Sequence, residues 1–330
     1  DDILETVSLI SGSRAVSDNN PPNWERKVIE SLALDALREQ RARRRWGIFF
    51  KLLGFIYLTV VLMIAFDWPG SAEGLADGKK HTALIDMTGV ISHKSDASAE
   101  NIIAALQAAF DDKHTAGVLL RINSPGGSPV QAGMINDEIR RLRAKHADIP
   151  LHAVVEDICA SGGYYVAAAA DKIFVDKASI VGSIGVLMDG FGFTGTMDKL
   201  GIERRLLTAG RNKGFLDPFS PQNAQHKAHA EQMLAEIHQQ FIAVVRQGRG
   251  QRLKETPEMF SGLMWTGAES VALGLADEFG SVESIARDVF KAESIREYTV
   301  KPNFAEKLAK KFGADMAEGA SNLMARWSLR

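Results

Sequence analysis

The stretch GVLLRINSPGGS, residues 117–128, decides the fold. Its first half, residues 117–122, is a short and nearly continuous apolar run, which is typical of a strand buried on both faces of a parallel sheet. A glycine-rich turn at residues 123–128 follows directly. Ligands of open α/β sheets bind outside the carboxyl ends of the strands, so this turn predicts a functional site at that edge.

The same alternation of short apolar runs and amphipathic segments continues on both sides of this stretch. It predicts an α/β fold with a mostly parallel sheet and flanking helices. Strands are expected at residues 83–92, 117–122, 152–155, 173–175 and 180–186, with a further candidate at 203–207. Helices are expected at residues 99–110, 130–145, 162–170, 222–247, 268–274 and 282–291, with Ser98 as the N-cap of the first.

Composition limits the classes of function. The chain has 330 residues, 45% of them hydrophobic, and a net charge of -2. This balance excludes a wholly disordered chain and argues against a globally basic nucleic-acid binder. The single cysteine, Cys159, permits neither an intrachain disulfide nor a cysteine-based zinc site. We therefore expect no cofactor, no metal and no nucleic-acid partner.

Residues 47–66, GIFFKLLGFIYLTVVLMIAF, predict a transmembrane helix. Their length matches a bilayer core of ~30 Å, and the one charge, Lys51, lies near an end where it can reach the interface. A buried core helix and a cleaved signal peptide are the alternatives. Arginines cluster before the span and acidic residues follow it, which places the N-terminus in the cytoplasm. The predicted divisions are a partly disordered cytoplasmic segment (1–46), the span (47–66), a linker (67–80), an exported domain (81–298) and a C-terminal amphipathic helix (299–330).

A second glycine-rich turn, CASGG at residues 159–163, also follows a strand and opens a helix. Ser161 in this turn is well placed for a nucleophile, since free amides at a helix start stabilise the anionic intermediate of acyl transfer. The more common role of a serine at this position is helix capping, and that alternative stays open. A G-x-S-x-G motif is absent, which argues against an α/β-hydrolase.

A nucleophilic serine needs a base, and none of the eight histidines lies in a glycine-rich or strand-end context. Lys213, in the loop TAGRNKGFL at residues 208–216, is the candidate. A lysine acts as a base only where an apolar environment lowers its pKa from ~10.4 towards 7–8. Phe215, Leu216 and Phe219 are the expected apolar wall. The alternative is a solvated surface lysine.

Four motifs in order, SPGG at 124–127, ASGGYYVAAAAD at 160–171, GSIGV at 182–186 and GRNKG at 210–214, resemble the signal peptide peptidase A family. Its members are membrane-anchored Ser/Lys peptidases of the ClpP/crotonase-like fold, and the resemblance covers residues 80–295. It implies that Ser161 is the nucleophile, Lys213 the general base and Ser183 the residue that orients the lysine amine. It also implies an oxyanion hole formed by the turn with Gly126 and Gly127, and the amide of Gly162 is the natural second donor.

The resemblance further implies a homo-oligomer whose active sites share a cavity. The expected substrates are apolar peptides such as remnant signal peptides, and the expected location is the bacterial inner membrane with the catalytic domain outside the cytoplasm. Ser161 and Lys213 of one site could come from one chain or from two neighbours. Three alternatives remain: a related peptidase with a specific membrane-protein substrate, a non-peptidase acyl-transfer enzyme of the crotonase fold, and an inactive membrane scaffold.

Overall fold

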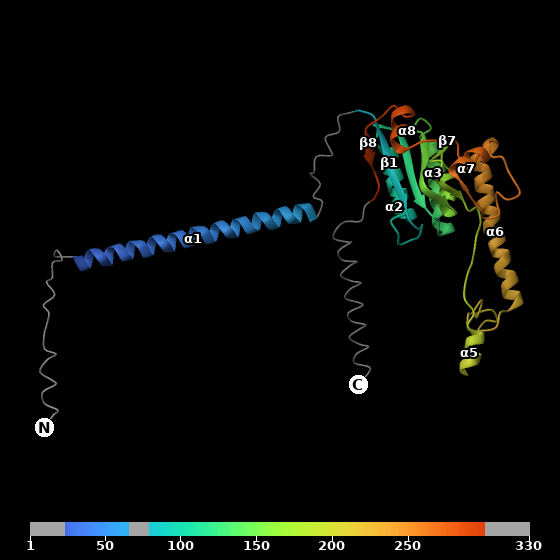
Figure 1. Cartoon of the computed structure of the whole chain (residues 1–330), viewed down its shortest axis with the longest axis horizontal. Helices are drawn as coiled ribbons and strands as arrows, with labels where there is room; N and C mark the ends of the chain where they lie inside the picture. The colour runs from blue at the N-terminus through green and yellow to red at the C-terminus, as the bar shows by residue number, and fades with distance from the viewer. Residues whose placement is uncertain (1–23, 66–78, 301–330) are drawn as a thin grey trace, which may run out of the picture. The chain divides into compact units, whose positions relative to one another are not determined.

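The computed structural model describes residues 24–65 and 79–300 (Figure 1). Two compact units make up this part of the chain. One contains helix α1 (Trp24–Ala65), and the other contains every element between residues 79 and 300. Residues 1–23 of the predicted cytoplasmic segment, most of the predicted linker and residues 301–330 of the predicted C-terminal helix lie outside the described residues.

Helix α1 is a single helix of 42 residues, which takes in the second half of the predicted cytoplasmic segment and nearly all of the predicted span. Within the ranges 24–65 and 79–300, no helix combines the length and the apolarity that crossing a membrane requires. The predicted transmembrane helix at 47–66 is therefore not found there, and its last residue, Phe66, lies outside the described residues.

The second unit is built on a mixed sheet. Its main path has the order β6-β5-β3-β2-β1-β8, and β4 joins β3 to β7 beside that path. The paired strands are parallel, apart from the antiparallel pair β5–β6. The mostly parallel α/β architecture is thus confirmed. The strands are β1 (His81–Thr88), β2 (Thr115–Ser124), β3 (Leu151–Ala160), β4 (Lys172–Val175), β5 (Ile180–Gly182), β6 (Met264–Thr266), β7 (Glu278–Phe279) and β8 (Ile295–Glu297).

Helices cover both faces of this sheet. The larger core lies between the sheet and helices α2, α3 and α4, while α8 packs on the other face over Leu84, Leu119, Val154 and Phe174. Ser98 caps α2 as predicted, since its side chain accepts a hydrogen bond from the amide of Asn101. The helices are α2 (Ala99–Asp111), α3 (Pro129–Lys145), α4 (Gly162–Ala167), α5 (Thr194–Leu200), α6 (Ala224–Arg249), α7 (Gly267–Leu273) and α8 (Val282–Asp288), with a 3-10 turn η1 (Gly250–Arg252).

Two strand predictions are wrong in extent or existence. Strand β5 ends at Gly182 rather than at residue 186, because Ser183 adopts a left-handed backbone that breaks the strand. Residues 203–207 form no strand, since no neighbouring segment pairs with them. Instead the side chain of Arg204 in this segment reaches Asp217, with Nε and Oδ2 3.3 Å apart.

Residues 186–223 extend from the body of the unit, carry α5, and lead back through α6 (Figure 1). We call these residues the extension. Many of its apolar side chains are exposed, among them Leu187, Phe191 and Leu207. The C-terminal half of α6 instead buries Phe241, Ile242 and Val245 against the body. Helix α6 therefore joins the extension to the core.

Candidate active site

The two predicted glycine-rich turns lie side by side because β2 and β3 are parallel neighbours. The pairing of Ser124 with Cys159 places both strand ends at the same edge. Gly126, with a φ of +100°, packs so closely on the second turn that a Cβ there would lie 2.7 Å from the Cβ of Ser161. Only glycine permits this approach, which explains the residue type at this position.

Ser161 occupies the N-cap position of α4, yet its side chain makes no capping hydrogen bond. Its backbone has φ 50° and ψ -122°, a conformation that costs a non-glycine residue about 1–3 kcal/mol. The amide of Ser161 donates to the carbonyl of Gly182, 2.9 Å away, and this bond holds the residue in place. The hydroxyl is thus left available for chemistry, and simple helix capping does not explain the serine.

Two backbone amides lie close together next to Ser161. A Cβ on Gly162 would lie 3.3 Å from the nitrogen of Gly127, so the amides of Gly127 and Gly162 border the same small space. Within the described residues, neither amide donates a hydrogen bond to the protein. The amide of Gly126 is occupied, because it donates to the Oγ of Ser124 at 3.1 Å. Gly127 and Gly162 are therefore the free donors among the predicted glycines.

Ser124 is a supporting residue that the sequence did not single out. Its buried hydroxyl donates to the carbonyl of Gly89 at 2.6 Å and accepts from the amide of Gly126. It thereby ties the glycine turn to the end of β1. The sequence signal was present in the SPGG motif, but a serine at a strand end has too many ordinary roles to be chosen from its position alone.

Ser183 stands at the end of β5, the strand that pairs with the end of β3. Its φ is 51°, and its amide donates to the carbonyl of Leu263 at 2.7 Å. Ser161 follows Ala160 and Ser183 follows Gly182, and these two preceding residues are paired across the strands. The structure therefore brings together Ser161, Ser183 and the three predicted glycines.

Lys213 is not part of this group. It lies in a turn of the extension, its amide donates to the carbonyl of Gly210, and its side chain is exposed. The predicted apolar wall does not enclose it: Phe215 packs on His226 and His229 of α6, and Phe219 stacks on Phe193. No hydrogen bond or ion pair within the described chain links Lys213 to Ser161 or Ser183.

The distance between Lys213 and the two serines can be judged along helix α6, which contacts both regions. Near its start, His226 and His229 contact the ring of Phe215, two residues from Lys213. Further along, the Nε2 atom of His238 lies 3.1 Å from the carbonyl oxygen of Ile184, next to Ser183. From His229, the nearer of these two histidines, to His238 the helix rises by about 14 Å, at ~1.5 Å per residue. A lysine side chain, about 6 Å long by the same bond geometry, does not span that gap.

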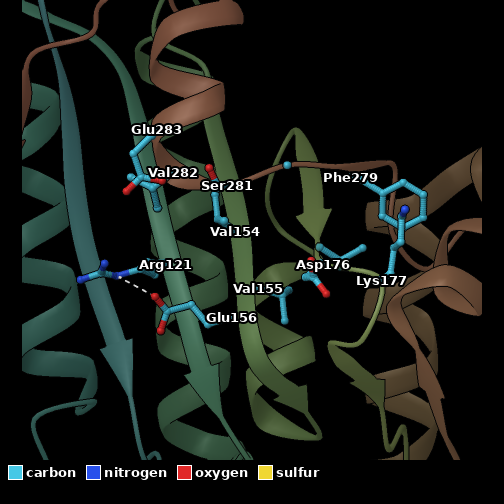
Figure 2. Close-up of a pocket in the computed structure, with 12 residues that line it drawn as sticks. Arg121, Val154, Val155, Glu156, Asp176, Lys177, Phe279, Ser281, Val282 and Glu283 are labelled. Carbon is cyan, nitrogen blue, oxygen red and sulfur yellow. Dashed lines mark ion pairs between the residues drawn. The ribbon is translucent and has the colours of Figure 1, made fainter.

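A separate cavity of about 480 Å³ lies on the α8 face of the sheet (Figure 2). Its charged lining residues carry both signs, and Arg121 pairs with Glu156 there, with 3.5 Å between Nε and Oε1. The Arg121 guanidinium also forms a bidentate pair with Asp86. Neither Ser161 nor the glycine turns line this cavity, so it is distinct from the candidate active site. In the described residues, no group of histidine, cysteine and acidic side chains is arranged to hold a metal ion.

Comparisons with known proteins show to which family the chain belongs. The model of Peptidase family S49 matches residues 143–296, which include Ser161, Ser183 and Lys213. The probable protease SohB of Haemophilus influenzae is 31% identical over 78% of this chain and 71% of its own length. The putative signal peptide peptidase SppA of Enterococcus faecium is 28% identical over 69% of each chain.

A further relative carries the name of a transporter rather than that of a protease. The Na(+)/H(+) antiporter NhaA of Brucella melitensis is 44% identical over 62% of this chain, and the chain spans 28% of the length of that protein. The match to the family model, together with 31% identity to SohB over 71% of the length of SohB, decides the assignment. The chain belongs to peptidase family S49, the signal peptide peptidase A family.

Proposed function

We propose that this protein is a serine endopeptidase in which Ser161 is the nucleophile, on a ClpP/crotonase-like scaffold. One observation carries the proposal: the Ser161 hydroxyl makes no cap bond and stands on a left-handed turn beside the free amides of Gly127 and Gly162. A hydroxyl without a capping bond, close to two neighbouring amide donors, fits the tetrahedral intermediate of acyl transfer.

In the proposed mechanism the Oγ of Ser161 attacks the peptide carbonyl while the neutral amine of Lys213 takes its proton. The amides of Gly127 and Gly162 donate to the resulting oxyanion. Lys213 then returns the proton to the leaving amine, and the peptide bond breaks to give an acyl-enzyme. Water, deprotonated by the same lysine, hydrolyses that ester and regenerates Ser161. The hydroxyl of Ser183 orients the lysine amine.

We propose that Lys213 reaches this site in a neighbouring copy of the chain, within a homo-oligomer whose sites share a cavity. The supporting observation is the separation along α6, which keeps Lys213 away from Ser161 and Ser183 of its own chain. The exposed apolar side chains of the extension also suit burial against another copy.

Apolar peptides, such as remnant signal peptides, are the proposed substrates. Exposed apolar side chains lie on both sides of the serines: Val130 and Met134 on α3, just after the glycine turn, and Leu263 and Met264 beside Ser183. A surface of this kind favours binding of apolar side chains in an extended peptide.

We also propose that residues 47–66 anchor the protein in the bacterial inner membrane, with the catalytic unit outside the cytoplasm. The described apolar side chains of α1 from Trp46 to Val60, such as Phe55 and Leu58, are exposed along the helix, as contact with lipid requires. Arg43, Arg44 and Arg45 precede them, which fits a cytoplasmic N-terminus. A reporter fused at residue 40 should remain cytoplasmic, and one fused at residue 80 should be exported. The reverse result would contradict the orientation.

The decisive experiment labels the full-length protein with a fluorophosphonate and measures cleavage of an apolar fluorogenic peptide. Wild type should be labelled and active, and Ser161→Ala should lose both properties while it keeps its oligomeric state. Mixing Ser161→Ala chains with Lys213→Ala chains should restore activity if a site draws on two chains. Retained turnover in Ser161→Ala would end the assignment, and no recovery in properly mixed oligomers would place the dyad in one chain.

A further inference from the structure

The base of the extension contains a contact between a histidine and a main-chain carbonyl. The chain leaves the body of the unit just after Ile184 and returns to it through α6. There the Nε2 atom of His238 lies 3.1 Å from the carbonyl oxygen of Ile184. A carbonyl can only accept a hydrogen bond, so the imidazole donates its Nε2–H. This bond ties the outgoing segment to the returning helix.

The bonded carbonyl belongs to the turn of Ser183. Ser183 donates its amide to the carbonyl of Leu263 at 2.7 Å, and its own carbonyl accepts from the amide of Gly185 at 2.9 Å. The side chain of Ile184 is fully buried, which anchors the residue that carries the bonded carbonyl. Loss of the His238 donor would remove the protein partner of this carbonyl and release one restraint on the turn that holds Ser183 at a positive φ.

The position of His238 on α6 explains why it can serve this turn. It lies three and four residues before Phe241 and Ile242, on the helix face that packs on the body. Towards its start the same helix carries His226 and His229, which contact Phe215 in the loop of Lys213. One helix therefore holds the serine turn at one point and the lysine loop at another.

We propose that His238 is a positioning residue of the peptidase site, which fixes the Ser183 turn and the direction in which the extension leaves the body. The inference rests on the proposed function. It follows that His238 acts on the lysine amine through Ser183, and on delivery of Lys213 through the extension. Its bond is to the main chain of the Ser183 turn, so its removal should slow the chemical step more than it weakens substrate binding.

Two substitutions test this in the full-length protein. His238→Leu removes the donor at similar size, whereas His238→Gln keeps a side-chain N–H that reaches the carbonyl. Gln239→Leu, on the exposed side of the same turn of α6, is the matched control. We expect His238→Leu to lower kcat about tenfold, with KM within about twofold of wild type, as the loss of one partly buried hydrogen bond predicts. The pH profile of kcat should shift in the same variant.

His238→Gln should restore most of the kcat and the wild-type pH profile, and Gln239→Leu should match wild type throughout. A His238→Leu enzyme with wild-type kcat and pH profile would overturn the inference. An equal loss in His238→Gln would also overturn it, because a lost donor could not then be the cause. If His238→Leu does not fold, His238→Asn, whose amide is one carbon shorter than that of Gln, takes its place. Fluorophosphonate labelling of wild type at Ser161 keeps the two proposals apart, since its absence would refute the peptidase itself.

Discussion

Ser161 and Ser183 both have a positive backbone φ, of 50° and 51°, and each directly follows the end of one of two paired parallel strands. Few positions in a protein favour this conformation for a residue other than glycine. Its occurrence at two adjacent serines indicates that the fold holds both hydroxyls at one edge at a cost in stability. That cost can be measured.

Replacement of Ser161 by glycine should stabilise the protein and abolish its activity. Glycine adopts the φ of +50° without strain, so the free energy of unfolding should rise by about 1 kcal/mol. Ser161→Ala keeps the strain and should be equally inactive without that gain. Urea unfolding of both variants makes the comparison, and a glycine variant no more stable than the alanine variant would contradict the strain argument.

Lys213→Arg should be nearly inactive, because a guanidinium does not lose its proton in a protein. Wild-type activity should rise with pH, since only the neutral amine accepts the serine proton. Lys227→Arg, at an exposed lysine of α6, controls for a general effect of the exchange. Full activity of Lys213→Arg would exclude lysine as the base and return attention to the histidines.

Gly127→Ala should damage both the fold and the activity. A Cβ there would lie 2.1 Å from the carbonyl oxygen of Ile91, which accepts a hydrogen bond from Ser128. Forcing that contact apart should cost about 2 kcal/mol of stability and displace the proposed oxyanion donor. Gly133→Ala, where a Cβ in α3 meets nothing within 4 Å, should leave activity intact and stabilise the helix slightly. Similar unfolding midpoints for the two variants would refute the steric argument.

His152 should make the protein less stable in acid. It lies buried on β3 against Phe174 and Phe290, and burial lowers its pKa from the ordinary 6.5, against the opposing charges of Asp171 and Asp277. The unfolded chain therefore binds the proton more readily than the folded one. The contribution of neutral His152 to the free energy of unfolding is fully present above pH 6.5 and is lost as the pH falls below that value.

His152→Phe should flatten the acidic decline in the free energy of unfolding, measured in urea between about pH 5 and 8. Part of the decline should remain, because burial also lowers the pKa of His81. His93→Asn, at an exposed histidine, should leave the curve unchanged. An unaltered curve for His152→Phe would show that this imidazole does not control acid stability.

Much of the architecture was predictable because hydrophobic periodicity reports burial directly. The apolar run at 117–122 predicted strand β2. The two glycine turns predicted the edge of the sheet at which Ser161, Ser183 and the glycines meet. A local sequence pattern does not show which segments will lie beside one another in the fold. Residues 203–207 have the composition of a short strand but lack a neighbour to pair with, and nothing near Lys213 indicates how far its loop extends from the serines.

The last strand, β8, completes the sheet by pairing with the first, β1, across more than two hundred residues of sequence. There the hydroxyl of Thr82 donates a hydrogen bond to the carbonyl of Ala292, and the Nε2 atom of His81 forms a hydrogen bond with the hydroxyl of Tyr298. A growing chain cannot close this edge until nearly the whole catalytic unit has been synthesised. Such non-local closure makes folding slow, and it leaves the edge of β1 open to mispairing until the end. A product truncated before residue 295 would therefore leave the edge of β1 exposed and free to pair with a strand of another chain.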